Sequence, residues 1–223
     1  MDKNTTILNY CRGKKVIDIG CVEELSDFSP EKMKQTLHYR LKQEIPDLIG
    51  VDLEEVGVAA LNKLGCNCYV SFAEDVGKLN LGLFDAIILG DIIEHVPDPC
   101  SLLFSLRNIM SDKGIIICTT PNALHYLNPI FLFLRKTITR HQHVAWHCRV
   151  TLKNLFWHAG FKEEKLHFLN FHKTTKNFLR VWLEKPLFSL CRELSPHLCG
   201  VYSMIPNFSL DDKRKLQLER KHD

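Results

Sequence analysis

The chain has 223 residues, of which 45% are hydrophobic and 25% charged, and 29 Lys and Arg against 26 Asp and Glu leave a formal net charge of +3. Since domains average about 150 residues, this length favours one domain over two. The composition supplies enough apolar material for a packed core and too little charge bias for disorder. We therefore predict a single domain, residues 1–223, that folds on its own.

The chain shows no targeting or membrane-spanning signal. Residues 1–15 contain no apolar run ahead of a small-residue cleavage site, and no stretch approaches the about 18 uncharged apolar residues of a membrane span. The nine cysteines include no C-x-x-C pair and several lie in apolar runs, as buried thiols do. Cys66 and Cys68 lie where a strand begins, so we expect thiols there, not a metal site or a disulfide. A reducing, cytoplasmic location is expected.

Short apolar runs alternate with longer amphipathic stretches, which is typical of βα units in a mostly parallel sheet. A sixth strand is expected over Phe161–Phe171, and a seventh, antiparallel and at the sheet edge, over Leu198–Ile205. The fold class predicted is α/β, a seven-stranded mostly parallel sheet with helices on both faces. The first five strands are expected at Lys15–Ile19, Asp47–Val51, Cys68–Ser71, Phe84–Leu89 and Gly114–Thr119.

Three helices are marked by their ends. Glu55–Leu64 is followed by Gly65, Pro99–Met110 begins with proline, and Thr151–Gly160 has a Thr cap and a closing glycine. A fourth helix, over residues 175–194 and interrupted at Pro186, is expected to cover the sheet, with peripheral membrane contact as the alternative. The predicted organisation is a ligand-binding half at 14–121, a lid and substrate segment at 122–148 over the carboxyl edge of the sheet, C-terminal helices and strands at 149–206, and a charged tail at 207–223.

The loop after the first strand carries the first chemical signal. Val16–Cys21 is a buried strand that ends in an acid and then Gly20, which lets the backbone approach a ligand closely. A dinucleotide-binding loop would show G-x-G-x-x-G and aim a helix N-terminus at pyrophosphate. Here Glu23 and Glu24 follow instead. Two carboxylates would repel a pyrophosphate, but they suit a cationic cofactor.

Acids also follow the next strands. Asp52 ends the second strand, where a carboxylate can accept both hydroxyls of a ribose. Glu74 and Asp75 follow the third, where an adenine amino group could donate to a carboxylate. Asp52 as a helix cap and Asp75 as a solvated loop acid are the structural alternatives. Four such pieces in order, the last being Leu89–Asp98 after the fourth strand, favour a nucleoside-binding site.

These runs resemble the class I S-adenosylmethionine-dependent methyltransferases, whose fold is Rossmann-like, and within them the branch of the ubiquinone-biosynthesis O-methyltransferases. The resemblance covers roughly residues 14–171, and Glu94–Pro97 with Thr120–Asn122 is its most specific part. His143–Trp146 followed by Thr151–Phe161 is also similar to small methyltransferases found among glycan and cell-surface polysaccharide enzymes. The runs that carry the resemblance are Val16–Cys21, Gly50–Asp52, Ala73–Asp75, Phe84–Asp98 and Thr119–Asn122.

The resemblance implies S-adenosylmethionine as cofactor and S-adenosylhomocysteine as product. The resemblance places residues of the first loop against the methionine part of the cofactor and residues after the second strand on its ribose. Two acids then lie near the adenine, and the end of the fourth strand runs along the side of the cofactor. The chain departs from the family where Cys21–Leu25 replaces the second and third glycines, and His38–Arg40 could form part of the pocket instead. The cofactor-binding residues so expected are Asp18, Gly20, Cys21, Asp52, Leu53, Glu74, Asp75, Leu89, Gly90 and Asp91.

Methyl transfer from a sulfonium is an in-line displacement, so the protein mainly holds donor and acceptor about 3 to 3.5 Å apart and dry. A hydroxyl acceptor is helped by a base, and histidine titrates in the right range. His95 follows Glu94 at the mouth of the fourth strand and is the first candidate base; its alternative role is to cap or to pack under Pro97. His143 is the second predicted catalytic residue, facing the acceptor from the lid with Trp146 packed over it.

Two sets of residues in the sequence are candidate metal ligands. His141, His143, His147 and Cys148 offer the usual zinc ligands, but their spacing fits no standard site, so we predict no metal there. By resemblance, Asp91, Glu94 and His95 match positions that bind magnesium in some relatives of the ubiquinone branch. Magnesium is therefore a second candidate cofactor.

The predicted function is methylation of a small-molecule or glycan hydroxyl. N- or C-methylation stays open, and the alternative class is a catalytically inactive, protein-binding module, which the missing glycines motivate. No nucleic-acid acceptor is expected, because the chain has no Asn-Pro-Pro-Tyr-type motif for a flipped base and no basic stripe interleaved with aromatics.

Overall fold

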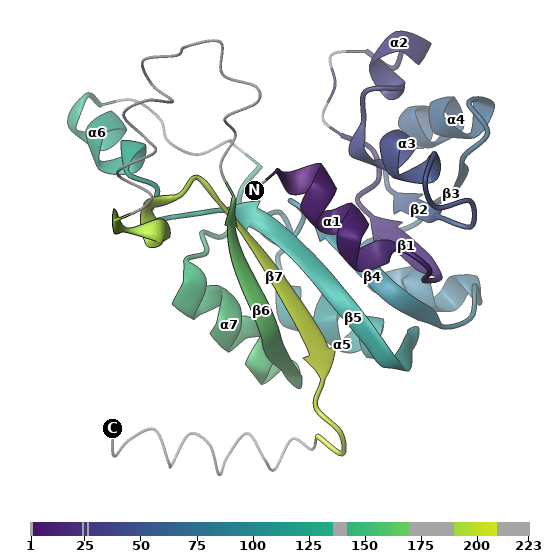
Figure 1. Cartoon of the computed structure of the whole chain (residues 1–223). Coiled ribbons are helices and arrows are strands. Elements are labelled where there is room, and N and C mark those ends of the chain that lie inside the picture. Colours follow the sequence, from purple (N-terminus) through teal and green to yellow (C-terminus); the bar gives the residue numbers. More distant parts are fainter. Residues whose placement is uncertain (1, 24, 26, 136–141, 170–189, 209–223) are drawn as a thin grey trace.

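The computed structural model describes residues 2–23, 25, 27–135, 142–169 and 190–208. Its centre is one seven-stranded sheet with the order β3-β2-β1-β4-β5-β7-β6 (Figure 1). Strands β1 to β5 pair in parallel, and β7 runs antiparallel to both of its neighbours. The predicted α/β sheet is confirmed. The strands are β1 (Val16–Ile19), β2 (Ile49–Asp52), β3 (Asn67–Val70), β4 (Phe84–Gly90), β5 (Met110–Pro121), β6 (Phe161–Leu169) and β7 (His197–Met204).

The last strand does not lie at the edge, so that part of the prediction is wrong. Strand β7 inserts between β5 and β6, with Ile115 opposite Ser203 and Pro121 opposite His197. Five consecutive residues, 198–202, are buried, as expected of a strand covered on both faces. The edge strand is β6, whose burial alternates more.

The three helices marked by their ends are present as α4 (Glu55–Lys63), α5 (Pro99–Arg107) and α7 (Arg149–His158). Thr151 is not the N-cap of α7 as expected. Cys148 holds that position, and the Thr151 hydroxyl accepts a hydrogen bond from the Cys148 N–H at 2.8 Å. The other described helices are α1 (Lys3–Cys11), α2 (Pro30–Met33), α3 (Leu37–Lys42), α6 (Leu127–Phe133) and the 3-10 helices η1 (Ala73–Leu79) and η2 (Arg192–Leu194).

Helices pack on both faces of the sheet (Figure 1). Alternate residues of a strand point to opposite faces, and β4 shows the consequence. Ile87 and Leu89 pack in the core beneath α5 and α7, whereas Ile88 packs with Ile7 of α1 and Leu41 of α3. A third cluster joins α4 to β3 and to the loop after β1. The strands are thereby fixed from both sides.

This arrangement brings the candidate site residues to the carboxyl edge of the sheet, where the parallel strands end. The parallel strands β1, β2, β4 and β5 all end there, and the register sets Asp18 opposite Gly50 and Gly90 opposite Thr119. Because β7 runs the other way, its first residue, His197, reaches the same edge beside Pro121. In the described part of the chain, no helix is long and apolar enough to cross a membrane. Most of the expected helix at 175–194, most of the tail at 207–223, and His141 lie outside the described residues.

Candidate active site

A cavity of about 700 Å³ opens at this edge. Its volume lies in the range of about 300 to 1,000 Å³ that small-molecule sites occupy, and the edge is where open α/β sheets bind ligands. Besides the strand ends, α1, α3 and β7 contribute to its wall. The lining residues are Lys3, Asp18, Gly20, Cys21, Val22, Glu23, Leu37, His38, Asp52, Gly90, Asp91, Ile92, Glu94, His95, Pro121, Gln142, His143 and His197.

The loop after β1 turns sharply at Gly20. Its φ of 78° is a left-handed conformation that glycine adopts without strain. The N–H groups of Gly20 and Cys21 both donate to the Val51 carbonyl, at 2.8 and 3.3 Å. A Cβ on Gly20 would stand 3.0 Å from Ile92 Cδ1. The turn therefore brings bare backbone to the cavity wall, as predicted for close approach to a ligand.

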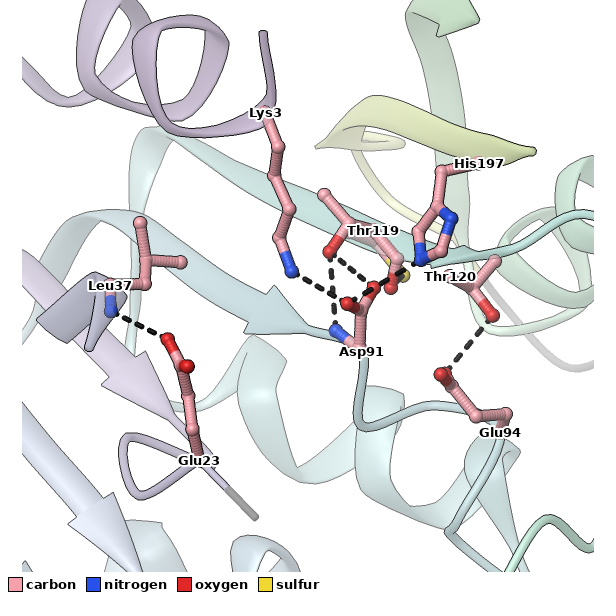
Figure 2. Close-up of polar contacts among 9 residues, drawn as sticks. Lys3, Glu23, Leu37, Asp91, Glu94, Thr119, Thr120 and His197 are labelled. Atoms are coloured by element: carbon pink, nitrogen blue, oxygen red, sulfur yellow. Dashed lines mark hydrogen bonds and ion pairs between the residues drawn. The ribbon is translucent and has the colours of Figure 1, made fainter. Parts of the chain in front are cut away.

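Two carboxylates of the cavity order the loops around it. Asp52 accepts from the Val22 N–H at 2.8 Å with one oxygen and from the Glu54 N–H at 3.0 Å with the other. Glu54, not Asp52, is the N-cap of α4. Glu23 accepts from the Leu37 N–H at 2.6 Å, which ties the loop to the start of α3 (Figure 2).

Asp18 is paired with a residue from the segment between β1 and β2. The Nδ1 atom of His38 lies 2.9 Å from Asp18 Oδ2, and the two side chains are 0% and 3% exposed. Burial lowers the pKa of His38, but hydrogen bonds to Asp18, Cys66 and Cys68 outweigh it and raise the pKa to about 11. The buried carboxylate thus faces an imidazolium that belongs to the cavity wall.

Asp91 follows β4 with a left-handed φ of 55°. Its carboxylate accepts from Lys3 Nζ at 2.6 Å and from the Thr119 hydroxyl at 2.8 Å, and His197 Nε2 lies 3.6 Å away (Figure 2). Burial would raise the pKa of Asp91, but His197 and Lys3 hold it well below its usual range. Asp91 is therefore an anion held between side chains of α1 and β7.

Glu94 is more deeply buried than Asp91, and its pKa is shifted in the opposite direction. It is 2% exposed and accepts from the Thr120 hydroxyl at 3.0 Å. Burial, with a smaller contribution from the negative charge of Asp91, raises the pKa of Glu94 to about 7. Its carbonyl accepts from the N–H groups of Val144 and Ala145 at 2.8 and 3.2 Å. The predicted lid is thus attached to the site at Glu94.

His95 and His143 meet edge to face, with ring centroids 4.7 Å apart. The Nδ1 atom of His95 lies 3.3 Å from the Gln142 carbonyl. One ligand atom from each of Glu94, His95 and His143 lies within 4.8 Å of the others. Asp91 does not belong to this group among the described residues, and its carboxylate binds Lys3 and Thr119.

A second cavity of about 350 Å³ adjoins the first, and Glu94, Pro121, His143 and His197 line both. Its other walls come mainly from residues 122–131 and 145–146 and include Asn122, Asn128, Phe131 and Trp146. This mixture of aromatic, amide and imidazole groups is typical of a small-molecule site. The predicted substrate segment therefore builds a compartment next to the two histidines.

Most of the expected cofactor residues line the larger cavity, but four do not figure among the lining residues described. Leu53 is 54% exposed, and Leu89 is fully buried in the core beneath α5 and α7. Glu74 and Asp75 lie on η1, where Asp75 pairs with Lys78 at 2.7 Å. The lining residues expected from the sequence are Asp18, Gly20, Cys21, Asp52, Gly90, Asp91, His95 and His143.

Lys3 and His197 are site residues that the sequence did not indicate. Each lies at the start of an element distant from β4 in the chain, and neither belongs to a local motif. Only the position of α1 and the register of β7 bring them to Asp91. By contrast, His38, which was considered for the pocket, does line it.

Comparison with known families agrees with this geometry. A family model described as a methyltransferase domain matches residues 7–166. The ubiquinone biosynthesis O-methyltransferase of Pseudomonas aeruginosa is 28% identical over 116 residues, which cover 49% of this chain and 45% of that protein. The Thiobacillus denitrificans protein of the same name is 26% identical over 176 residues, covering 74% and 71%. The chain thus spans a little under half the length of the Pseudomonas relative.

Solved structures show the same fold. A methyltransferase of Archaeoglobus fulgidus, described as SAM dependent, aligns with a TM-score of 0.61 at 20% identity, covering 89% of this chain and 90% of its own. The plantazolicin methyltransferase BamL, solved with S-adenosylhomocysteine, aligns with a TM-score of 0.57 at 17% identity, covering 90% and 82%. Together with the family match, these findings show that the chain belongs to the class I S-adenosylmethionine-dependent methyltransferases.

Proposed function

We propose that the chain binds S-adenosylmethionine in the larger cavity and methylates a hydroxyl group of a small-molecule or glycan acceptor held in the smaller one. The observation that carries this proposal is the position of Glu94 and His143, which line both cavities, with His95 beside them. A methyl donor on one side and an acceptor on the other would meet at these side chains.

The volume of the larger cavity and the carboxylates in its wall support its assignment to the cofactor. The left-handed turn at Gly20 exposes backbone, and the carboxylates of Glu23 and Asp52 line the wall, so the cavity suits a cationic nucleoside. When bound, the cofactor supplies a methyl group activated by the positive charge on sulfur. We assign Asp52 to the ribose hydroxyls and the Gly20 turn to the methionine part. Glu74 and Asp75 remain proposed adenine neighbours.

His95 is the proposed proton acceptor, and His143 is its neighbour in the site. His95 is held by the Gln142 carbonyl and by the ring of His143. Because His143 lines both cavities, the histidine pair borders an acceptor hydroxyl bound in the smaller cavity. His95 takes the proton from the acceptor hydroxyl, and His143 positions the ring of His95. Glu94, whose pKa is raised to about 7 by burial, can hold or release a proton near neutral pH beside them.

A hydroxyl acceptor is supported by the curated relatives, which are named for O-methylation. A cytoplasmic location is supported by the cysteines, all nine of which are thiols. Magnesium is left out of the proposal, because Asp91, one of its three expected ligands, already binds Lys3 and Thr119.

The first test is calorimetric titration of S-adenosylmethionine and S-adenosylhomocysteine into the wild-type protein and the Asp52→Ala variant. We expect micromolar binding to the wild type and its loss in the variant. Asp112→Ala is the matched control, since that exposed carboxylate lies near the start of β5, at the opposite edge of the sheet. A screen of sugars and phenols as acceptors follows.

No saturable binding to the folded wild-type protein would overturn the proposal. It would favour the alternative of a protein-binding module that does not bind the cofactor. The structural argument for this alternative is that Asp18 is already paired with His38. In that case the carboxylate expected to face the methionine part would serve the fold alone.

A further inference from the structure

Two thiols and an imidazole meet at the wall of the larger cavity, and the proposed reaction uses none of them. Cys21 follows β1, His38 lies on α3 and Cys68 on β3, and their exposed fractions are 2%, 0% and 6%. All three surround Gly50. A Cβ on Gly50 would stand 2.6 Å from Cys68 Sγ and 2.8 Å from both Cys21 Sγ and His38 Cε1. The missing side chain at this position makes room for the cluster.

The ligand atoms have the spacing of a metal site. One ligand atom each of Cys21, His38 and Cys68 lies within 4.8 Å of the others, and His38 Nε2 is 3.4 Å from Cys68 Sγ. Zinc bonds of about 2.0 Å to nitrogen and 2.3 Å to sulfur in a tetrahedron place ligand atoms roughly 3.6 Å apart. Small side-chain movements would therefore suffice to coordinate an ion.

Asp18 orients the imidazole as a metal site requires. Its carboxylate binds Nδ1 of His38 at 2.9 Å, which turns Nε2 toward the thiols. Metal-binding histidines almost always donate their second ring N–H to a carboxylate, a carbonyl or water, and a carboxylate also raises the basicity of the ligand. A buried imidazole needs a hydrogen-bond partner in any case; here the partner is a carboxylate at Nδ1, which leaves Nε2 on the side of the thiols.

We propose that Cys21, His38 and Cys68 form a binding site for a zinc ion, with the fourth coordination position open to the cavity. Thiolate and imidazole ligands select zinc over magnesium or calcium. Cys21 and His38 line the cavity, which gives the ion a path from solvent. On binding, each thiol and Nε2 of His38 releases its proton to the buffer.

Such an ion would tie two walls of the cavity to a neighbouring strand. It would link the loop after β1, where the family's second and third glycines are replaced, to α3 and to β3. The zinc site is independent of the proposed methyl transfer, because it is defined by its own ligands and can be measured without the cofactor.

Cobalt titration tests the site, since Co²⁺ bound by thiolates reports its ligands through its absorption. The full chain is reduced with a phosphine, freed of metal and titrated with CoCl₂. We expect one equivalent of Co²⁺ to give visible bands of a tetrahedral ion together with near-ultraviolet sulfur-to-cobalt charge transfer, and one equivalent of ZnCl₂ to abolish both. Absence of the charge-transfer band in the reduced, folded protein would overturn the proposal.

Variants assign the ligands. Cys21→Ser with Cys68→Ser should abolish the charge-transfer band, and Cys68→Ser alone should reduce it by about half, which keeps the test valid if the double variant does not fold. His38→Asn should weaken Co²⁺ binding at least tenfold. Cys100→Ser, on α5 and outside the cluster, is the matched control and should leave the spectrum unchanged. A band that persists in the folded double variant would contradict the site.

One competing site needs its own control. Glu94, His95 and His143 could also bind Co²⁺, but without a thiolate they would give no charge-transfer band. His143→Ala should therefore leave that band intact; its loss in this variant would overturn the assignment to Cys21, His38 and Cys68. Titration of S-adenosylhomocysteine into the metal-free protein is a separate readout, so a failed zinc site and a failed cofactor site are told apart.

Discussion

Lys3 Nζ lies 2.6 Å from the carboxylate of Asp91, although 88 positions separate the two residues in the chain. The pair joins the first turn of α1 to the end of β4, and the side chains are only 17% and 31% exposed. Thr119 and His197 complete the surroundings of the carboxylate. This one contact therefore couples the position of α1 to the wall of the larger cavity.

Removing the ammonium should destabilise the fold. Lys3→Met leaves Asp91 in a largely buried place without its nearest cation, and breaking a buried ion pair costs about 3 to 5 kcal/mol; partial exposure reduces this to about 1 to 3 kcal/mol here. Urea unfolding at neutral pH measures it. Lys78→Met, which breaks an exposed pair with Asp75, should cost under about 1 kcal/mol. Equal losses in the two variants would contradict the role of Lys3.

The elements of the sheet could be predicted because burial leaves a local trace. Apolar runs such as Ala86–Leu89 are continuous where both faces of a parallel strand are covered, and strand β4 is found there. The place of β7 could not be read in the same way. Its residues indicate a buried strand, but its insertion between β5 and β6 depends on contacts with distant parts of the chain.

The site residues likewise divide into those that local sequence motifs identify and those that only tertiary packing brings together. Gly20 follows β1, Asp52 ends β2 and His95 lies in the loop after β4. The carboxyl ends of the parallel strands therefore bring these residues together, and sequence motifs identify them. Lys3 and His197 reach that edge from α1 and β7 and carry no motif. His38 and its thiol neighbours likewise come together only through tertiary packing, so the spacing of Cys66 and Cys68 gave no hint of Cys21.

Glu94 should make stability fall as the pH rises. Burial raises its pKa in the folded state to about 7 from the usual 4.5, so the folded state favours the neutral acid and stability is lost between these two pH values. At about 1.4 kcal/mol per pKa unit the loss is about 3 kcal/mol. Glu94→Gln should remove this loss and be more stable than wild type at pH 8 but not at pH 4.

Urea unfolding at several pH values separates this effect from that of His38. The pKa of His38 is raised to about 11, so its contribution is fully present below about pH 6.5 and lost as the pH rises through 11. Below pH 6.5 the slope of the unfolding free energy against pH should therefore depend on Glu94. Glu31→Gln, an exposed change on α2, is the control. An unchanged slope in Glu94→Gln would show that the carboxyl is ionised in the fold.

The proposed base should affect turnover without affecting cofactor binding. His95→Ala removes a general base, which typically contributes 10²- to 10⁴-fold to rate, so kcat should fall by about that factor. Affinity for S-adenosylhomocysteine should change less than about threefold. His158→Ala, at the end of α7, is the matched control. Normal turnover in His95→Ala would show that the base assignment is wrong.

Gly20 allows the cost of its backbone conformation to be separated from the cost of contact. Gly20 and Gly65 both have left-handed φ angles, 78° and 83°, but a Cβ on Gly65 would meet nothing within 4 Å. Both Gly→Ala variants should lose about 1 to 2 kcal/mol of stability for the backbone. Only Gly20→Ala also presses a methyl group against Ile92 Cδ1 at 3.0 Å, so it alone should weaken S-adenosylhomocysteine binding, by about tenfold or more.

A second substitution tests the cause of that loss. Ile92→Val removes the Cδ1 atom that the new methyl group would meet, so Gly20→Ala combined with Ile92→Val should regain part of the lost affinity, as measured by calorimetry, without regaining the backbone cost. If Gly20→Ala and Gly65→Ala bind S-adenosylhomocysteine equally well, the turn after β1 does not form the wall against which the cofactor lies. The cofactor would then have to be held mainly by side chains such as Asp52.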